Sequence, residues 1–312
     1  MRSLILSVFT PAVRRRYDVM MLPGIVTPAS KVILLLSVLL GRRFVFCADS
    51  VFRPSESTTK NKLRSLRLNR AVKFAGAVLV PGRASRDYFE AQGVPAARVF
   101  EGLYNLDPAE IEERYRHAIS ERESLRARHR IRPSDFVFLM AANFIPNRCH
   151  EILFEAFRKL PERMNASLVL IGEGPRQQHI EALCSSEAFR NVRLIGSVPF
   201  RELAVWYAAA DAYVHSGYEP YSTALQFAAI VGLPIVTTVG VGAAADYLLP
   251  DYSNLLSEVK DAERLAKNMI RMATDSEMVN GLRQNVRRLA AKRTADWAAD
   301  QFEQAAKMAL GK

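Results

Sequence analysis

The sequence predicts an α/β protein built on parallel sheets, and three observations lead to this fold class. Short apolar runs alternate with amphipathic segments of helical period from about Phe136 onward, which is typical of βαβ units. The first part of the chain shows the same alternation less completely. At 312 residues with 49% hydrophobic side chains, the chain is long enough for two domains of ordinary size.

The second half has the most regular pattern. Its strands are short, apolar runs, and its helices carry apolar residues at helical spacing, which predicts a doubly wound domain. The predicted strands are 136–144, 167–172, 192–196, 212–216 and 234–238, and the predicted helices are 150–160, 176–186, 201–210 and 222–231.

The first part contains fewer complete units. Strands are predicted at 17–22, 43–49 and 77–82, and helices at 29–40, 62–76 and 84–93. The charged stretch 109–130 has no apolar stripe over its second half, so we expect a solvent-exposed connector there. The sequence therefore predicts a first domain over 1–130, a second over 131–290 and a final helical segment over 291–312.

The net charge of +11 is concentrated in the first domain. Residues 1–130 carry 23 Lys and Arg against 12 Asp and Glu, whereas residues 131–312 carry 20 of each. A basic face suits nucleic acid, anionic lipid or a phosphate-bearing substrate, and a merely solvated surface is equally compatible. Nucleic acid is the least favoured partner, because the basic residues are not interleaved with aromatics and form no recognition motif.

Other patterns exclude several classes of protein. The apolar run 32–40 is about half the length of a membrane span, and the N-terminal apolar run has no small-residue cleavage site, so we expect a cytosolic protein. The three cysteines and five histidines show no metal-ligand spacing. We therefore expect no metal and no cofactor.

Polar residues and glycines follow the predicted strands of the second half. In open parallel sheets, ligands bind beyond the carboxyl ends of the strands, where these loops lie. The loops carry Asn143 and Arg148, Gly172 and Gly174, Glu219, and Gly240, Gly242 and Asp246. Each feature alone fits an ordinary tight connection, but together they suit an anionic ligand with hydroxyl groups, such as a sugar nucleotide.

The helix predicted from Ser222 is the most specific of these features. Pro220 and Ser222 or Thr223 mark its start, and Gly232 marks its end. Its first turn presents free backbone N–H groups and the positive end of the helix dipole, which is a natural phosphate site. Glu219, just upstream, is placed to accept hydrogen bonds from hydroxyls of the same ligand.

The second half resembles the nucleotide-sugar-binding domain of retaining glycosyltransferases with the GT-B fold, the glycosyl transferases group 1 family. The matching stretches begin with NFIPNRCHEILFEAF and LVLIGEGPRQQHIEAL, continue through AYVHSGYEP and QFAAIVGLPIVTT, and end with VGVGAAADYLLPDYSNLL. The resemblance implies two Rossmann-like domains, with the acceptor on the first and the sugar nucleotide on the second. The final helix is expected to cross back to the first domain.

The resemblance also implies roles for individual residues. Glu219 matches the first of two signature glutamates, Arg148 the residue that contacts the diphosphate, and Asp49 an acidic residue of the first domain. Glu219 and Asp49 are therefore the expected catalytic residues, and chemistry without a metal is implied. The expected donor-binding residues are Asn143, Arg148, Gly172, Gly174, Pro220, Tyr221, Ser222, Thr223, Gln226, Gly240 and Gly242.

Four departures from the family pattern accompany this match. Phe227 occupies the position of the second signature glutamate and cannot accept a hydrogen bond, although Gln226 is adjacent. Asn143 stands where the family has a basic residue, and Ala48 precedes Asp49 where the family has histidine. The segment 14–24 resembles the middle of the family's first domain, so we expect that domain to be incomplete.

The function expected from these features is transfer of a sugar from a nucleotide diphosphate-sugar to a glycan or lipid-linked acceptor in polysaccharide or lipopolysaccharide assembly. The basic N-terminal part, including Lys60, Lys62 and Arg64, is expected to meet an anionic membrane surface from the cytosolic side. The alternative is a non-catalytic, sugar-nucleotide-binding accessory protein of the same fold, which Phe227 and the incomplete first domain favour.

Overall fold

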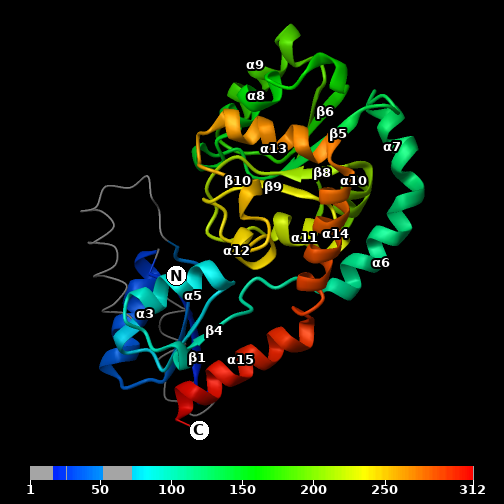
Figure 1. Cartoon of the computed structure of the whole chain (residues 1–312). Helices are drawn as coiled ribbons and strands as arrows, with labels where there is room; N and C mark the ends of the chain where they lie inside the picture. Colours follow the sequence, from blue (N-terminus) through cyan, green and yellow to red (C-terminus); the bar gives the residue numbers. More distant parts are fainter. Residues whose placement is uncertain (1–16, 26, 52–71, 312) are drawn as a thin grey trace. The chain divides into compact units, whose positions relative to one another are not determined.

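The computed structural model describes residues 17–25, 27–51 and 72–311 (Figure 1). The chain forms two compact units: unit 1 comprises 1–105 with 295–312, and unit 2 comprises 106–294. Most of the basic helix predicted at 62–76, with Lys60, Lys62 and Arg64, lies outside the described residues.

Unit 1 contains a parallel sheet in the order β1-β2-β3-β4. The four strands are β1 (Met20–Pro23), β2 (Phe44–Cys47), β3 (Ala77–Leu79) and β4 (Val99–Phe100). Alternate residues of β2 point to opposite faces, so that Phe44 and Phe46 join one buried cluster and Val45 another.

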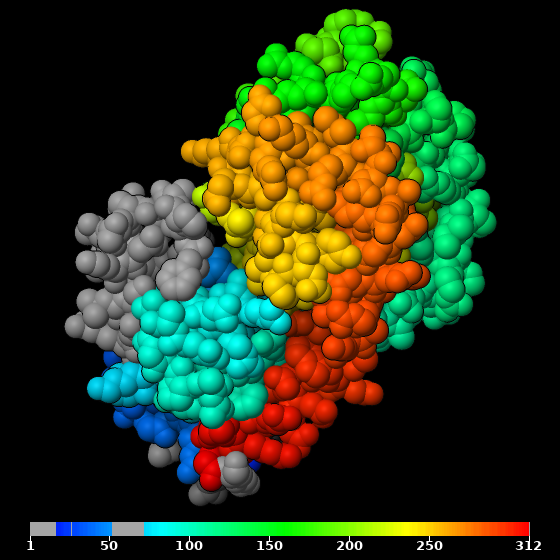
Figure 2. Space-filling view, viewed as in Figure 1, coloured from blue at the N-terminus to red at the C-terminus, as the bar shows by residue number. Residues whose placement is uncertain are grey.

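Helices cover both faces of this sheet. They are α3 (Pro28–Leu39), α5 (Arg83–Ala91) and α15 (Ala295–Leu310), with a 3-10 turn η1 (Ala96–Arg98) before β4. Figure 2 shows α15, in red, against the cyan segment that includes β4. The helix approaches so closely at Ala309 that a Cβ on Gly76 would lie 2.4 Å from its Cα. Residues 295–310 are thus an integral part of unit 1.

Unit 2 contains a six-stranded parallel sheet in the order β10-β9-β8-β5-β6-β7. Five of its strands confirm the predicted strands of the second half. The strands are β5 (Phe136–Ala141), β6 (Ala166–Ile171), β7 (Val192–Gly196), β8 (Ala212–Val214), β9 (Ile235–Thr238) and β10 (Leu256–Ser257).

Two groups of helices flank this sheet. Helix α8 (His150–Arg158) packs against α13 (Ala262–Thr274), whereas α10 (Leu203–Ala209) and α11 (Thr223–Val231) pack with other helices. Right-handed crossovers place α8 and α9 on one face and α10 and α11 on the other. The remaining elements are α6 (Pro108–Ala118), α7 (Arg122–Arg128), α9 (Gln177–Cys184), α12 (Ala244–Tyr247), α14 (Ser276–Ala290) and the 3-10 turns η2 (Ile119–Glu121), η3 (Pro146–Arg148), η4 (Glu162–Met164), η5 (Glu187–Phe189), η6 (Phe200–Glu202) and η7 (Ser253–Leu255).

Helices α6 and α7 are not the solvent-exposed connector predicted for 109–130. They pack against α10, and Leu125 and Arg126 are buried. Asp211 accepts from Arg122 at 2.6 Å and from Arg126 at 2.7 Å, and it also binds the amide of Val137. These long-range ion pairs bind the segment to unit 2, so the division between units precedes the predicted boundary at 130/131.

No helix in the described part of the chain is both long and apolar enough to cross a bilayer. Helix α3 is nevertheless apolar on most sides, and Val32, Leu35 and Leu39 on it are exposed.

Candidate functional site

The candidate site lies where the connections of the unit 2 sheet diverge. β5 has β6 on one side and β8 on the other, and the chain leaves β5 towards β6 but leaves β8 towards β9. The loops after β5 (142–149) and after β8 (215–222) therefore flank the switch point of the sheet, where open α/β sheets bind ligands. The first loop carries Arg148 and the second carries Glu219.

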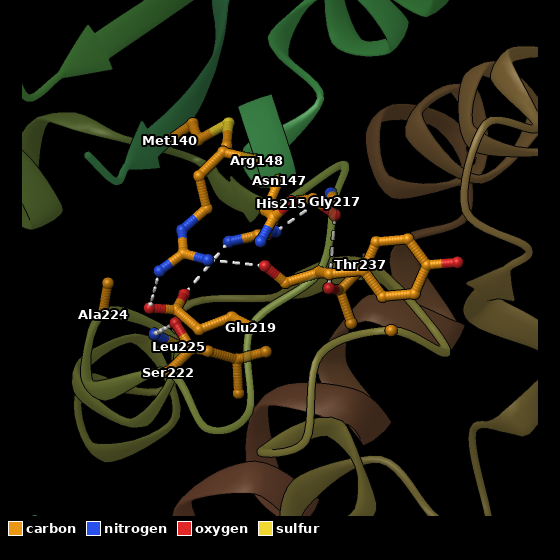
Figure 3. A network of polar contacts seen from close by, with 12 residues as sticks. Met140, Asn147, Arg148, His215, Gly217, Glu219, Ser222, Ala224, Leu225 and Thr237 are labelled. Carbon is orange, nitrogen blue, oxygen red and sulfur yellow. Dashed lines mark hydrogen bonds and ion pairs between the residues drawn. The ribbon is translucent and has the colours of Figure 1, made fainter. Parts of the chain in front are cut away.

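The two oxygens of the Glu219 carboxylate have different partners (Figure 3). Oε1 accepts a hydrogen bond from Nη2 of Arg148 at 2.7 Å, and Oε2 lies 3.1 Å from Nε2 of His215. Nη1 of Arg148 donates to the carbonyl oxygen of Tyr218 at 2.5 Å. The Arg148 guanidinium thus binds both the Glu219 carboxylate and the backbone carbonyl of the preceding residue.

This environment keeps Glu219 ionised. Burial raises the pKa of the carboxyl, but the hydrogen bond from His215 and the positive charge of Arg148 act in the opposite direction, and the pKa is lowered. The side chain of Arg148 is only 11% exposed, and its buried Nε has no hydrogen-bond partner among the described residues. The site is therefore a partly buried ion pair in which the Nε–H group of Arg148 has no partner among the described residues.

The glycine-rich loop after β9 holds the backbone of Glu219. The Glu219 amide donates to the carbonyl oxygen of Gly240 at 3.0 Å, and the Gly242 amide donates to the carbonyl oxygen of Glu219 at 2.9 Å. The Gly240 amide donates to Oγ1 of Thr238. These two amides of the predicted donor-binding glycines are engaged within the protein, and their contribution here is to fix Glu219.

Helix α11 begins beside this carboxylate. Ser222 is its N-cap and accepts from the amide of Leu225 at 3.2 Å, and Gly232 ends it in the left-handed conformation at φ 70°. Thr223, which is exposed, is the first helical residue, so its amide has no carbonyl partner within the helix. Pro220 is half-buried in the connection between Glu219 and the cap.

Three predicted or adjacent side chains of this region point into the protein instead. Tyr221 and Gln226 are 5% and 1% exposed, and both side chains lie near the buried side chain of Tyr247. Phe227 is 1% exposed, with its ring 4.2 Å from that of Tyr207. The structure therefore places the side chains of Gln226 and Phe227 in the protein interior.

The loop after β6 packs against the loop that carries Arg148. The amide of Phe144 donates to the carbonyl oxygen of Glu173, and a Cβ on Gly172 or Gly174 would lie 2.0 or 2.6 Å from a carbonyl oxygen of that loop. Asn143 is exposed on it. A cavity of about 490 Å³ adjoins these loops and is lined by Glu173, Gly174, Gln177, Gly196 and Ser197, without Glu219.

Asp49 belongs to unit 1. It follows β2 and is half-buried. Burial raises the pKa of Tyr104, and the charge of nearby Asp49 raises it further.

Sequence reasoning missed His215, Ser216 and Gly217, which shape the loop before Glu219. The Oγ of Ser216 lies 3.0 Å from the carbonyl oxygens of both Arg148 and Cys149, which share its one proton as acceptors. The signal for His215 in the sequence is its position four residues before Glu219 and directly after a buried strand.

The whole chain resembles solved structures that share its fold. The Anabaena protein HepE, solved with UDP and glucose, matches with a TM-score of 0.74 and 20% identity over 98% of this chain and 80% of that chain. Sucrose-phosphate synthase from Thermosynechococcus elongatus matches with a TM-score of 0.74 and 17% identity over 97% of this chain and 76% of that chain. The likeness confirms the predicted GT-B architecture of two parallel-sheet domains.

Curated relatives match a shorter stretch. An uncharacterised glycosyltransferase of Methanocaldococcus jannaschii is 30% identical over 127 residues, which are 40% of this chain and 32% of that protein. A GDP-mannose-dependent alpha-mannosyltransferase of Corynebacterium glutamicum is 29% identical over 121 residues, which are 38% of this chain and 27% of that protein. The match thus spans about a third of the length of these relatives. The family model for glycosyl transferases group 1 matches residues 121–289, more than half of the chain, and the protein therefore belongs to that family.

Proposed function

We propose that the protein is a retaining, metal-independent glycosyltransferase of the hexosyltransferase type that uses a nucleotide diphosphate-sugar. The observation that carries the proposal is the Arg148–Glu219 pair beside the N-terminus of α11, at the switch point of the sheet. A cation and a helix N-terminus favour a phosphate, and an ionised carboxylate favours sugar hydroxyls.

In this proposal each group has a separate task. Arg148 and the first amides of α11 bind the diphosphate and stabilise the negative charge that develops on it as the glycosidic bond breaks, a role that a metal ion takes elsewhere. Glu219 orients the donor sugar at the reacting carbon. Asp49 of unit 1 is the second proposed catalytic residue, in the domain proposed to bind the acceptor. Asn143, Gly172 and Gly174 contribute the walls next to the nucleoside.

The proposed acceptor is a cell-surface glycan or a lipid-linked precursor, met at the cytosolic face of a membrane. Exposed Val32, Leu35 and Leu39 on α3 support a weak, peripheral contact with lipid, and the net charge of +11 supports a preference for anionic headgroups. Sedimentation with vesicles of phosphatidylcholine alone or with phosphatidylserine tests this part: binding to the anionic vesicles alone is expected, and binding to neither contradicts it.

A second candidate is a non-catalytic sugar-nucleotide-binding protein. The buried positions of Gln226 and Phe227 favour it, because neither side chain is presented to a ribose beside Glu219. The two candidates share the binding site and differ in turnover.

One experiment separates them. Binding of UDP-glucose and GDP-mannose is measured by calorimetry, and donor hydrolysis or transfer is measured with and without EDTA. The enzyme reading predicts turnover that is unaffected by EDTA and is lost in Glu219→Ala. Binding without turnover establishes the second candidate, whereas turnover that survives Glu219→Ala removes the role assigned to Glu219.

A further inference from the structure

The ring of His215 has a defined hydrogen-bond polarity. It is completely buried, Gly217 donates its amide hydrogen to Nδ1 at 3.2 Å, and Nε2 lies 3.1 Å from Oε2 of Glu219. Because a backbone N–H is only a donor, Nδ1 must be the acceptor and carry no proton. The ring proton is therefore on Nε2, from which it is donated to the carboxylate.

We propose that His215 is a positioning residue for Glu219: as the neutral Nε2–H tautomer, it holds one carboxylate oxygen in the orientation that the donor sugar requires. This inference rests on the proposed function for its catalytic consequence, but the tautomer and the hydrogen bond can be measured without any substrate.

The surrounding backbone fixes the ring. The amide of His215 donates to the carbonyl oxygen of Val236 at 3.0 Å, and its own carbonyl oxygen accepts from Oγ1 of Thr237 at 3.2 Å. Gly217 is fixed in turn, because its carbonyl oxygen accepts from Oγ1 of Thr238 at 2.7 Å and a Cβ on it would lie 2.3 Å from the carbonyl oxygen of Asn147. The donor to Nδ1 is thus held by β9 and by the loop after β5.

The two contacts to Glu219 have different consequences. Arg148 is also the proposed diphosphate ligand, so its hydrogen bond to Oε1 must be shared once a diphosphate arrives. His215 is fully buried, and Oε2 of Glu219 is the hydrogen-bond partner of its Nε2 among the described residues. His215 therefore keeps the Glu219 carboxylate oriented while Arg148 hydrogen-bonds to the diphosphate. A carboxylate held in place before the reaction is the preorganisation that catalysis needs.

Other titratable groups face this pair from the neighbouring elements. Burial lowers the pKa of His150 to about 3, so this second imidazole is neutral at physiological pH. Tyr207 and Tyr213 are buried, and their pKa values are raised first by burial, so they too stay neutral. The titratable and charged groups facing His215 and Glu219 are Arg148, His150, Tyr207 and Tyr213.

A matched pair of variants tests the proposal. Gln and Met have nearly the same shape, but only Gln retains an amide N–H near the position of Nε2. With UDP-glucose or GDP-mannose, we expect His215→Met to lower kcat about ten- to a hundredfold, as for loss of a hydrogen bond to a charged group, with little change in KM. His215→Gln should retain most of kcat. The acid limb of the pH profile should move up in His215→Met and stay in place in His215→Gln.

Two NMR measurements need no activity. The ¹⁵N spectrum of the five histidines, with His215 assigned from His215→Gln, should show the Nε2–H tautomer. A ¹³C-carboxyl titration, with Glu219 assigned from Glu219→Gln, should show a higher pKa for Glu219 in His215→Met than in His215→Gln.

The outcomes are distinct. An Nδ1–H tautomer, equal losses of kcat in two folded variants, or full activity of His215→Met overturns the proposal. If no nucleotide-sugar binds or turns over, but both NMR results hold, then the proposed function fails while the positioning of Glu219 by His215 stands.

Discussion

Replacement of Phe227 by glutamate restores the family's second signature residue in sequence, yet the structure predicts that it damages the protein. The ring of Phe227 is 1% exposed and lies between Tyr207 and Phe200, at centroid distances of 4.2 and 6.2 Å. Phe227→Glu removes this packing and places a carboxyl in an apolar environment. It should therefore destabilise unit 2 without supplying a ribose contact.

The magnitude follows from two contributions. Loss of a buried phenylalanine side chain costs about 3–5 kcal/mol, of which the carbon atoms of glutamate recover part. A fully buried carboxyl is forced to remain protonated, and holding it neutral at pH 7 costs about 3–4 kcal/mol, from about 1.4 kcal/mol for each pH unit above its ordinary pKa. The sum is comparable to the whole stability of a typical domain, about 5–15 kcal/mol.

The assay is urea unfolding of wild type, Phe227→Glu and the control Phe227→Leu at pH 7 and pH 5. Because the introduced carboxyl has a higher pKa in the folded than in the unfolded state, the penalty is full at pH 7 and shrinks as pH falls towards the unfolded-state pKa. Phe227→Leu should lose about 1 kcal/mol at both pH values. A Phe227→Glu protein as stable as wild type at pH 7, with tighter nucleotide binding, would refute the interior placement of this side chain.

Three further changes probe the packing of unit 2. Asp211→Asn should cost about 3 kcal/mol in urea unfolding because it leaves buried Arg126 without its counter-charge, whereas Glu110→Gln in an exposed pair should cost under about 0.5 kcal/mol; equal effects would contradict this. His150 is neutral in the folded state but becomes protonated in the unfolded state as the pH falls. The free energy of unfolding of wild type should therefore fall by about 2 kcal/mol between pH 7 and pH 5, and that of His150→Phe should fall by less. Cys149→Gly should stabilise by up to about 1 kcal/mol because Cys149 adopts φ 49°, and a lower urea midpoint would count against that reasoning.

Local patterns predicted much of unit 2. The short apolar runs located five strands of its sheet, since buried parallel strands need little beyond continuous apolar side chains. The start of α11 at Ser222 and its end at Gly232 were also readable, because caps depend on neighbouring residues. Glu219 was recognised from its place before that helix.

The rest depends on partners distant in sequence. Arg122 and Arg126 read as the surface charges of a connector, and only the fold shows Asp211 between them. The role of His215 needs the positions of Gly217 and Glu219 on either side of its ring. The sequence indicates Gly240 and Gly242 as donor-binding residues, and only the structure shows that their amides have partners within the protein.

The central claim is that Arg148, beside Glu219 and the start of α11, binds the diphosphate of a sugar nucleotide. Calorimetry with UDP and uridine, and with GDP and guanosine, on wild type and Arg148→Met measures the phosphate contribution by difference. We expect wild type to bind one diphosphate more tightly than its nucleoside, and Arg148→Met to lower the affinity for that diphosphate about ten- to a hundredfold without changing the affinity for the nucleoside. Unchanged affinity for the diphosphate in folded Arg148→Met would contradict it.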